Sequence, residues 1–226
     1  LFGDPKNWND PSMHIAYRSQ FDQKEEPDTD EESMVLFLLQ KWKMATTGKY
    51  SNDADFHKSL VQIAKDPKFD DITQSQYSYI FRGSKYNVNN ILNFAKTTES
   101  RDWIPLKDFP FGKYVSHANV LIGCTKLYSY KPTSLITSWT TELDQALNFI
   151  DNVDPIVMIQ DMTKLKRGDS IFTGGDSYEN SFDAISNDNS GEGEILGLKK
   201  EFNVNIAIPK TYVEKLIRLN VIRSGA

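Results

Sequence analysis

The hydrophobic periodicity of the chain changes from mainly helical to mainly strand-like near residue 70. Before that point, apolar residues recur at helical spacing in two segments, one after Thr29 and one that begins near Asp53 and ends before Pro67. From Tyr77 onward, apolar and polar residues alternate or form short apolar runs between turn residues, as in β-strands. A helical start followed by many short strands is typical of an α+β fold. We therefore predict an N-terminal arm and helical lobe over residues 1–70 and a strand-rich core over residues 71–226.

The expected helices of the lobe each have one apolar face. The first face holds Met34, Leu38, Trp42 and Ala45, and the second holds Phe56, Leu60, Ile63 and Ala64. In the core, we predict short helices at residues 88–96 and after Thr140. We predict strands at residues 77–82, 120–124, 135–139, 155–162, 169–172, 202–208 and 213–222, and a loop at residues 173–191.

Composition and charge narrow the functional classes. The net charge of −5 argues against general binding of nucleic acid through its phosphates, although a local basic groove stays possible. The single cysteine, Cys124, cannot form an intramolecular disulfide, and with three histidines it cannot build a common zinc site, so we expect a buried thiol and no metal. Without an apolar run of about 18 residues, we expect a soluble chain that does not enter a membrane. Because it begins at Leu1 rather than Met, we expect a processed product or a piece of a longer protein.

Two carboxylates precede an apolar pair near the C-terminal end of the expected loop. Glu192 and Glu194 are two residues apart, and Ile195 and Leu196 follow directly. Residues two apart on a strand point to the same face, so both carboxylates can face one cleft. Considered alone, such a pair is more often a solvated hairpin tip, and only partners elsewhere in the chain favour a cleft.

Two other segments can supply partners for these acids. Arg82 ends an apolar strand just before Gly83, a position that suits a guanidinium facing a phosphate, a carboxylate or a structural ion pair. Ser138 and Thr140 lie at a strand end, where their hydroxyls can orient a carboxylate or cap the next helix. The interval from Arg82 to Ser138 equals the interval from Ser138 to Glu194, 56 residues each.

These three segments together resemble the motifs of mono-ADP-ribosyltransferases. They are residues 79–83 (YIFRG), 135–140 (LITSWT) and 192–196 (EGEIL), and they are similar to the Arg, Ser-x-Ser/Thr and Glu-x-Glu motifs of that family. The similarity is to the clostridial binary-toxin-like enzymes and the Alt-type and Mod-type proteins of tailed phages, and it covers about residues 77–210. Trp139 is bulkier than the usual residue between the two hydroxyls, and we expect it to point away from the cleft. Residues 197–200 (GLKK) replace the Pro-Arg-Gly-type turn that often follows the third motif.

The resemblance implies a mixed β-sandwich of two small sheets around a cleft that binds NAD as a substrate. In that family pattern, Arg82 would hold the phosphates or the nicotinamide ribose, and Gly83 would offer backbone groups to the carboxamide. Ser138 would position the catalytic acid, and Thr140 would lie near the nicotinamide. Phe172, at the start of the expected loop, could stack on the nicotinamide, although a plain surface loop fits the sequence equally well.

The two glutamates would then have different roles. Glu194 would stabilise the cation that forms as nicotinamide leaves, and Glu192 would assist the attacking group, where a Glu goes with arginine as the acceptor. The expected activity is therefore transfer of ADP-ribose from NAD to an exposed arginine of a target protein. We expect a monomer that acts in the cytoplasm of a host cell after delivery or processing. The alternatives are an NAD glycohydrolase, transfer to nucleic acid or RNA, and an NAD-binding or interaction module without catalysis.

Overall fold

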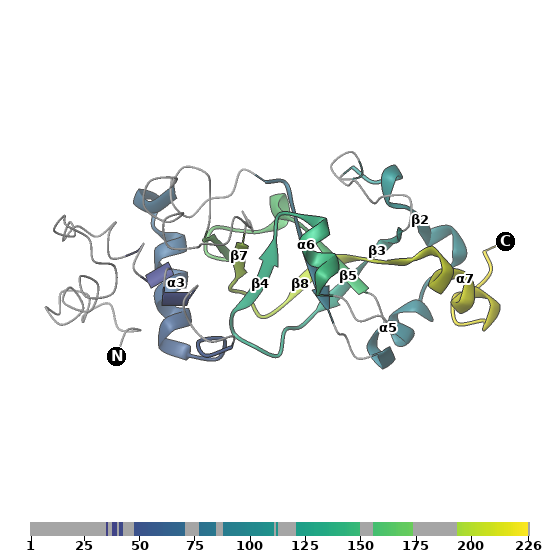
Figure 1. Cartoon of the computed structure of the whole chain (residues 1–226), viewed down its shortest axis with the longest axis horizontal. Helices are drawn as coiled ribbons and strands as arrows, with labels where there is room; N and C mark the ends of the chain where they lie inside the picture. Colours follow the sequence, from purple (N-terminus) through teal and green to yellow (C-terminus); the bar gives the residue numbers. More distant parts are fainter. Residues whose placement is uncertain are drawn as a thin grey trace, which may run out of the picture.

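The strands of the protein form one antiparallel sheet. The computed structural model describes residues 35, 38, 39, 41, 42, 48–70, 77–84, 88–110, 112, 121–149, 156–173 and 194–225. In this part of the chain, eight strands lie in the order β2-β3-β8-β5-β1-β4-β7-β6. The strand bounds are β1 Tyr79–Ser84, β2 Trp103–Pro105, β3 Leu121–Tyr130, β4 Thr137–Thr140, β5 Ile156–Asp161, β6 Ser170–Phe172, β7 Glu194–Gly197 and β8 Phe202–Pro209. In Figure 1, β7 and β4 lie toward the end of the molecule that carries α3 (Ala54–Lys65), and β3 and β2 lie toward the end that carries α7 (Lys210–Arg218). The α+β class is confirmed, whereas the two-sheet sandwich is not, because the described strands all belong to a single hydrogen-bonded sheet.

The sheet is weakly paired in its middle. Strands β1 and β5 pair through six residue positions, whereas β1 and β4 pair only through Phe81 and Thr140. On one side of this junction lie β2, β3, β8, β5 and β1, and on the other lie β4, β7 and β6. Along most of their facing edges, the backbone groups of β1 and β4 are therefore not paired with each other.

Helix α3 (Ala54–Lys65) packs the N-terminal segment onto the β4-β7-β6 side of the sheet. Its first turn is capped by Asp53, whose Oδ1 accepts hydrogen bonds from two backbone N–H groups at 3.0 and 2.9 Å. The buried face of α3 shares one hydrophobic cluster with the helical residues Leu38 and Leu39 before it, with Ile136 just before β4, and with the strand residues Ile171 and Leu196. The segments before and after residue 70 thus share a core.

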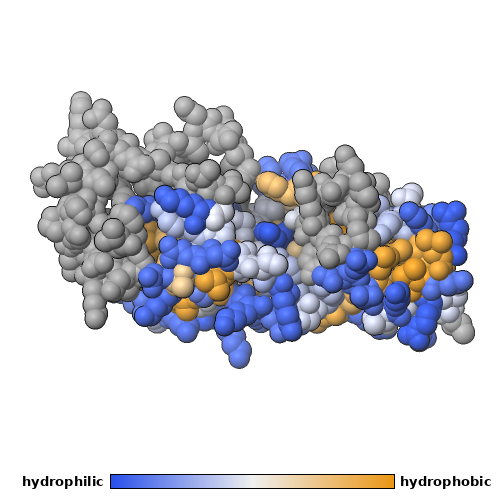
Figure 2. All heavy atoms as spheres, turned by 90° about the horizontal axis from the view of Figure 1, so that it is seen from below, coloured by the Kyte–Doolittle hydropathy of each residue, from blue (hydrophilic) through white to orange (hydrophobic). Residues whose placement is uncertain are grey.

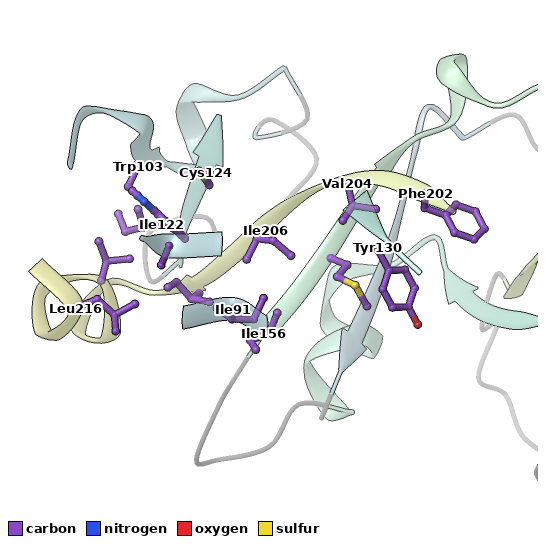
Figure 3. Packing of buried hydrophobic residues seen from close by; sticks show 14 of the residues in the cluster. Ile91, Trp103, Ile122, Cys124, Tyr130, Ile156, Phe202, Val204, Ile206 and Leu216 are labelled. Atoms are coloured by element: carbon purple, nitrogen blue, oxygen red, sulfur yellow. The ribbon is translucent and has the colours of Figure 1, made fainter. Parts of the chain in front are cut away.

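The larger hydrophobic cluster lies under the β3-β8-β5-β1 part of the sheet (Figure 3). It packs strand residues such as Ile206 against Ile91 of α5 (Val88–Ala95) and Leu216 of α7 (Lys210–Arg218). Cys124 is fully buried in it, and burial raises the pKa of the thiol to about 11 because an apolar environment disfavours the thiolate. This confirms that Cys124 is a buried small side chain.

Short helices complete the described elements. The remaining α-helix is α6 (Leu143–Asn148), which packs against β1 and β4, and the 3-10 helices are η2 Pro67–Phe69, η3 Ser100–Asp102, η4 Leu106–Asp108 and η6 Met162–Lys164.

Several sequence predictions are corrected. The segment 213–222 is not a strand, since residues 210–218 form α7, with Val213 and Leu216 buried three positions apart as on a helix face. The helix is followed by Asn220 at φ 54°, a left-handed conformation that Asn tolerates. Strand β3 continues to Tyr130, beyond the predicted end at residue 124, and β2 was missed. Gly83 lies inside β1 rather than ending it.

The described surface is mainly hydrophilic, with an apolar area at the end of the molecule that carries α7 (Figure 2). Large apolar side chains with substantial exposure are Tyr77, Leu127, Phe149 and Leu219. None of the helices in the described ranges has both the length and the apolar character needed to cross a membrane.

Candidate functional site

The pairing of β4 with β7 brings Ser138 and Glu194 together. Thr140 is directly opposite Glu194, and Ser138 is opposite Leu196. Side chains of directly opposed residues, and of residues two apart on one strand, lie on the same face of a sheet. Ser138 Oγ donates a hydrogen bond of 2.7 Å to Glu194 Oε1. Two residues 56 positions apart are thus joined at a partly buried site, as the sequence predicts.

The Glu194 carboxylate has two further donors. Trp42, in the helical segment before α3, donates from Nε1 to Oε1 at 3.1 Å. Thr173 follows β6 and lies 3.3 Å from Oε2 through its Oγ1. The backbone N–H of Thr173 also donates to the Glu194 carbonyl at 3.0 Å, which extends the β6-β7 pairing by one residue. Donors from three separate segments therefore surround this one carboxylate.

Sequence reasoning missed both of these donors. Trp42 was assigned only to the apolar face of a helix, and an indole at such a position is usually plain core. Thr173 was placed at the start of a loop, with no pattern to distinguish it from other threonines. Nothing in the local sequence indicates that either residue reaches Glu194.

Arg82 bridges the weakly paired junction of the sheet. Its Nη1 donates to the backbone carbonyl of Ser138, on the neighbouring strand β4. Its Nε is buried and has no hydrogen-bond partner among the described residues. The structure thus brings Arg82 and Ser138 together through a carbonyl, and it shows no ion pair of Arg82 with Glu194. Arg82, Ser138 and Glu194 form one continuous chain of contacts across β1, β4 and β7.

Gly83 and Thr140 are next to these residues and have local structural contacts. A Cβ at Gly83 would lie 1.9 Å from the carbonyl oxygen of Ala146, so only glycine allows α6 to approach β1 this closely. Thr140 Oγ1 accepts a hydrogen bond of 3.1 Å from the backbone N–H of Glu142. Thr140 supports the turn before α6, and Glu142 itself occupies the N-cap position.

Phe172 lies on the other face of the sheet from the Glu194 side chain. It is directly opposite Ile195, so these two share a face, whereas Glu194 points the other way. Its ring packs at a tilt against Tyr77, with 6.5 Å between centroids. Trp139 also points away from Ser138, as expected, and packs against Tyr130 and Phe202. The structure therefore places Phe172 on the face opposite the side chains of Ser138, Thr140 and Glu194.

Glu192 and the expected loop at residues 173–191 fall outside the described residues, except for Thr173. Within the described ranges, no group of three or more His, Cys, Asp or Glu side chains could hold a metal ion.

Comparisons with protein-family models, with curated proteins and with solved structures gave no match to this chain. The chemistry of the site therefore has to be inferred from its geometry. A carboxylate fixed by several donors and partly open to solvent is suited to stabilise a positive charge that develops on a bound substrate.

Proposed function

We propose that this protein is an NAD-dependent mono-ADP-ribosyltransferase that modifies arginine side chains of a target protein. The observation that carries the proposal is the 2.7 Å hydrogen bond from Ser138 to Glu194. The Arg82 contact with the Ser138 carbonyl supports it, because it joins the first motif to the second. Three short motifs that are each weak alone thus come from strands that follow one another in the sheet, β1, β4 and β7.

The proposed substrate site is a cleft at the junction of β1 and β4. In this proposal, the two parts of the sheet act as the two small sheets that flank NAD in the family. The single residue pair between β1 and β4 supports it, because a sheet separates most easily where its pairing is weakest. The buried Arg82 Nε, with no partner among the described residues, provides a donor next to that junction. Arg82 would contact the phosphates or the nicotinamide ribose, with Gly83 and Thr140 beside it.

The proposed reaction breaks one bond and forms one. The bond between ribose C1′ and the nicotinamide nitrogen breaks, and nicotinamide leaves with the electron pair. Glu194 stabilises the positive charge left on the ribose. A guanidinium nitrogen of the acceptor arginine forms the new bond to C1′, and Glu192 accepts the proton that this nitrogen loses. Guanidinium needs this second carboxylate because it is fully protonated and a poor nucleophile.

The test is transfer of label from labelled NAD to proteins of a cell lysate. We expect Glu194→Gln to abolish both nicotinamide release and protein labelling, since the cation loses its counter-charge. Glu192→Gln should keep nicotinamide release and lose arginine labelling. Glu201→Gln is the matched control, because Glu201 is an exposed carboxylate that accepts a hydrogen bond from Ser129 and lies outside the proposed site.

Different outcomes separate the alternatives. Labelling that is unchanged in Glu194→Gln contradicts the proposal. Nicotinamide release without any labelled protein indicates an NAD glycohydrolase, with water in place of the acceptor.

A further inference from the structure

We propose that Trp42 is a positioning residue for Glu194, and that it holds one carboxylate oxygen so that the other faces the substrate. This inference rests on the proposed function, because it assigns a role within the same site. Trp42 Nε1 and Ser138 Oγ both donate to Oε1, at 3.1 and 2.7 Å. The helical segment before α3 thereby becomes part of the catalytic machinery.

The indole of Trp42 is held in place by aromatic packing. It stacks on Phe56 of α3, with 6.3 Å between centroids and an interplanar angle of 23°. Phe56 is buried, and it stacks in turn on Tyr50 at 4.7 Å and 14°. Because α3 packs on Leu196 and Ile171 of β7 and β6, the position of the indole is tied to the strand that carries Glu194.

The two oxygens of Glu194 differ in the donors that they have. A carboxylate offers about four lone-pair sites, two on each oxygen. Oε1 accepts from both Ser138 and Trp42, which uses its two sites. Among the described residues, the only donor to Oε2 is Thr173 Oγ1 at 3.3 Å, and this hydroxyl is closer to the Glu194 carbonyl, at 3.1 Å. A hydroxyl has one hydrogen to donate, so within the described part of the chain Oε2 is the oxygen with free acceptor capacity.

A substrate hydroxyl would therefore bind at Oε2. In the proposed reaction this is a hydroxyl of the nicotinamide ribose, next to the carbon on which positive charge develops. Two donors on Oε1 stop the carboxylate from rotating, so that Oε2 keeps its direction. Without the indole N–H, Oε1 keeps only the hydrogen bond from Ser138, and fewer molecules hold the productive orientation.

The experiment compares Trp42→Phe with a matched tryptophan variant. Phe keeps an aromatic ring against Phe56 and removes only the N–H donor and part of the ring. Trp103→Phe is the control, because Trp103 also donates from Nε1 to a side chain, Thr98 Oγ1 at 2.8 Å, but lies on β2 at the opposite end of the sheet order from β7. We expect Trp42→Phe to lower kcat for nicotinamide release about tenfold, with KM unchanged, and Trp103→Phe to leave both unchanged.

A second readout needs no activity. The indole N–H resonance that disappears in Trp42→Phe identifies Trp42 in the NMR spectrum. We expect this resonance to move in Glu194→Gln, because the acceptor loses its charge, while the Trp103 resonance stays in place. An unmoved Trp42 resonance, or equal kcat in the two tryptophan variants, overturns the inference. Wild-type protein that releases no nicotinamide overturns the proposed function instead, and the resonance still decides whether Trp42 holds Glu194.

Discussion

Glu194 is the first residue of its strand, and its side chain is fixed by residues that the strand itself does not provide. Ser138 comes from the neighbouring strand β4, Trp42 from a helical segment 152 positions away, and Thr173 from the end of β6. Each donor belongs to an element that packs on β7 or pairs with it. The direction of the carboxylate therefore depends on the packing of the helical segment as well as on the sheet.

Removal of the Ser138 hydroxyl should weaken catalysis without unfolding the protein. A hydrogen bond to a charged group contributes about 2 kcal/mol, so Ser138→Ala should lower kcat for nicotinamide release roughly thirtyfold. The measurement is steady-state nicotinamide release together with thermal unfolding. Ser129→Ala is the matched control, since Ser129 also donates to a carboxylate, Glu201, at an exposed site on β3. Equal activity of the two variants would contradict the role of Ser138.

The sequence indicated the residues that meet across β1, β4 and β7, but it did not indicate the other two donors to the Glu194 carboxylate. Arg82, Ser138 and Glu194 were singled out because their three motifs, each weak alone, occur in the order and spacing of the family that they resemble. Trp42 and Thr173 were not, because their role depends on how a helix packs on the sheet and on where β6 ends. The sequence predicts that Phe172 lies near the nicotinamide. It does not reveal that Phe172 pairs with Ile195, and this register directs the ring to the other face of the sheet.

At the scale of elements, the contact between α6 and β1 sets the position of the Arg82 strand. Gly83 is directly under the end of α6, and an added Cβ would lie 1.9 Å from the Ala146 carbonyl oxygen. Such a contact is with backbone, so relief requires that the helix or the strand moves. The residue after Arg82 therefore has a structural reason to be glycine, independent of any ligand.

Gly83→Ala should destabilise the fold by about 1 to 3 kcal/mol, the usual cost of overpacking a tight contact. The measurement is the free energy of unfolding in urea. Gly225→Ala is the control, because a Cβ there would have its nearest neighbour at 3.4 Å, an ordinary contact. Equal stability of the two variants would show that α6 can move away from β1 at little cost.

Elements with regular periodicity were predicted well, and others were not. Helix α3 was predicted to within a residue because its cap and its apolar face agree. The segment that forms α7 was read as a strand because its apolar residues are also β-branched or bulky, and the spacing of Val213 and Leu216 was overlooked. Strand β3 was predicted too short because its apolar run ends at Cys124 and the next three residues are exposed, although Tyr130 at the end of the strand is buried again.

At the scale of the whole molecule, the sheet has a junction at which a ligand could stabilise both sides together. Strands β1 and β4 are paired at one position, Phe81 with Thr140, and the side chain of Arg82 donates a hydrogen bond to the Ser138 carbonyl beside it. A substrate that touches residues of both strands adds contacts where the backbone has few. NAD should therefore stabilise the fold as a unit, and the α3 cluster, which includes Ile171 of β6 and Leu196 of β7, should unfold together with the rest.

The expected effect of NAD follows from mass action. A ligand at a hundred times its Kd adds about 2.7 kcal/mol to the free energy of unfolding, which corresponds to roughly 5 to 10 °C in Tm for a chain of this size. Glu194→Gln is the protein to use, because under the proposed activity the wild-type protein would consume NAD during the measurement. GTP at the same concentration is the control for nonspecific binding of a nucleotide. If NAD raises Tm no more than GTP does, the junction of β1 and β4 is not an NAD site, and the chain of contacts from Arg82 to Glu194 is then structural.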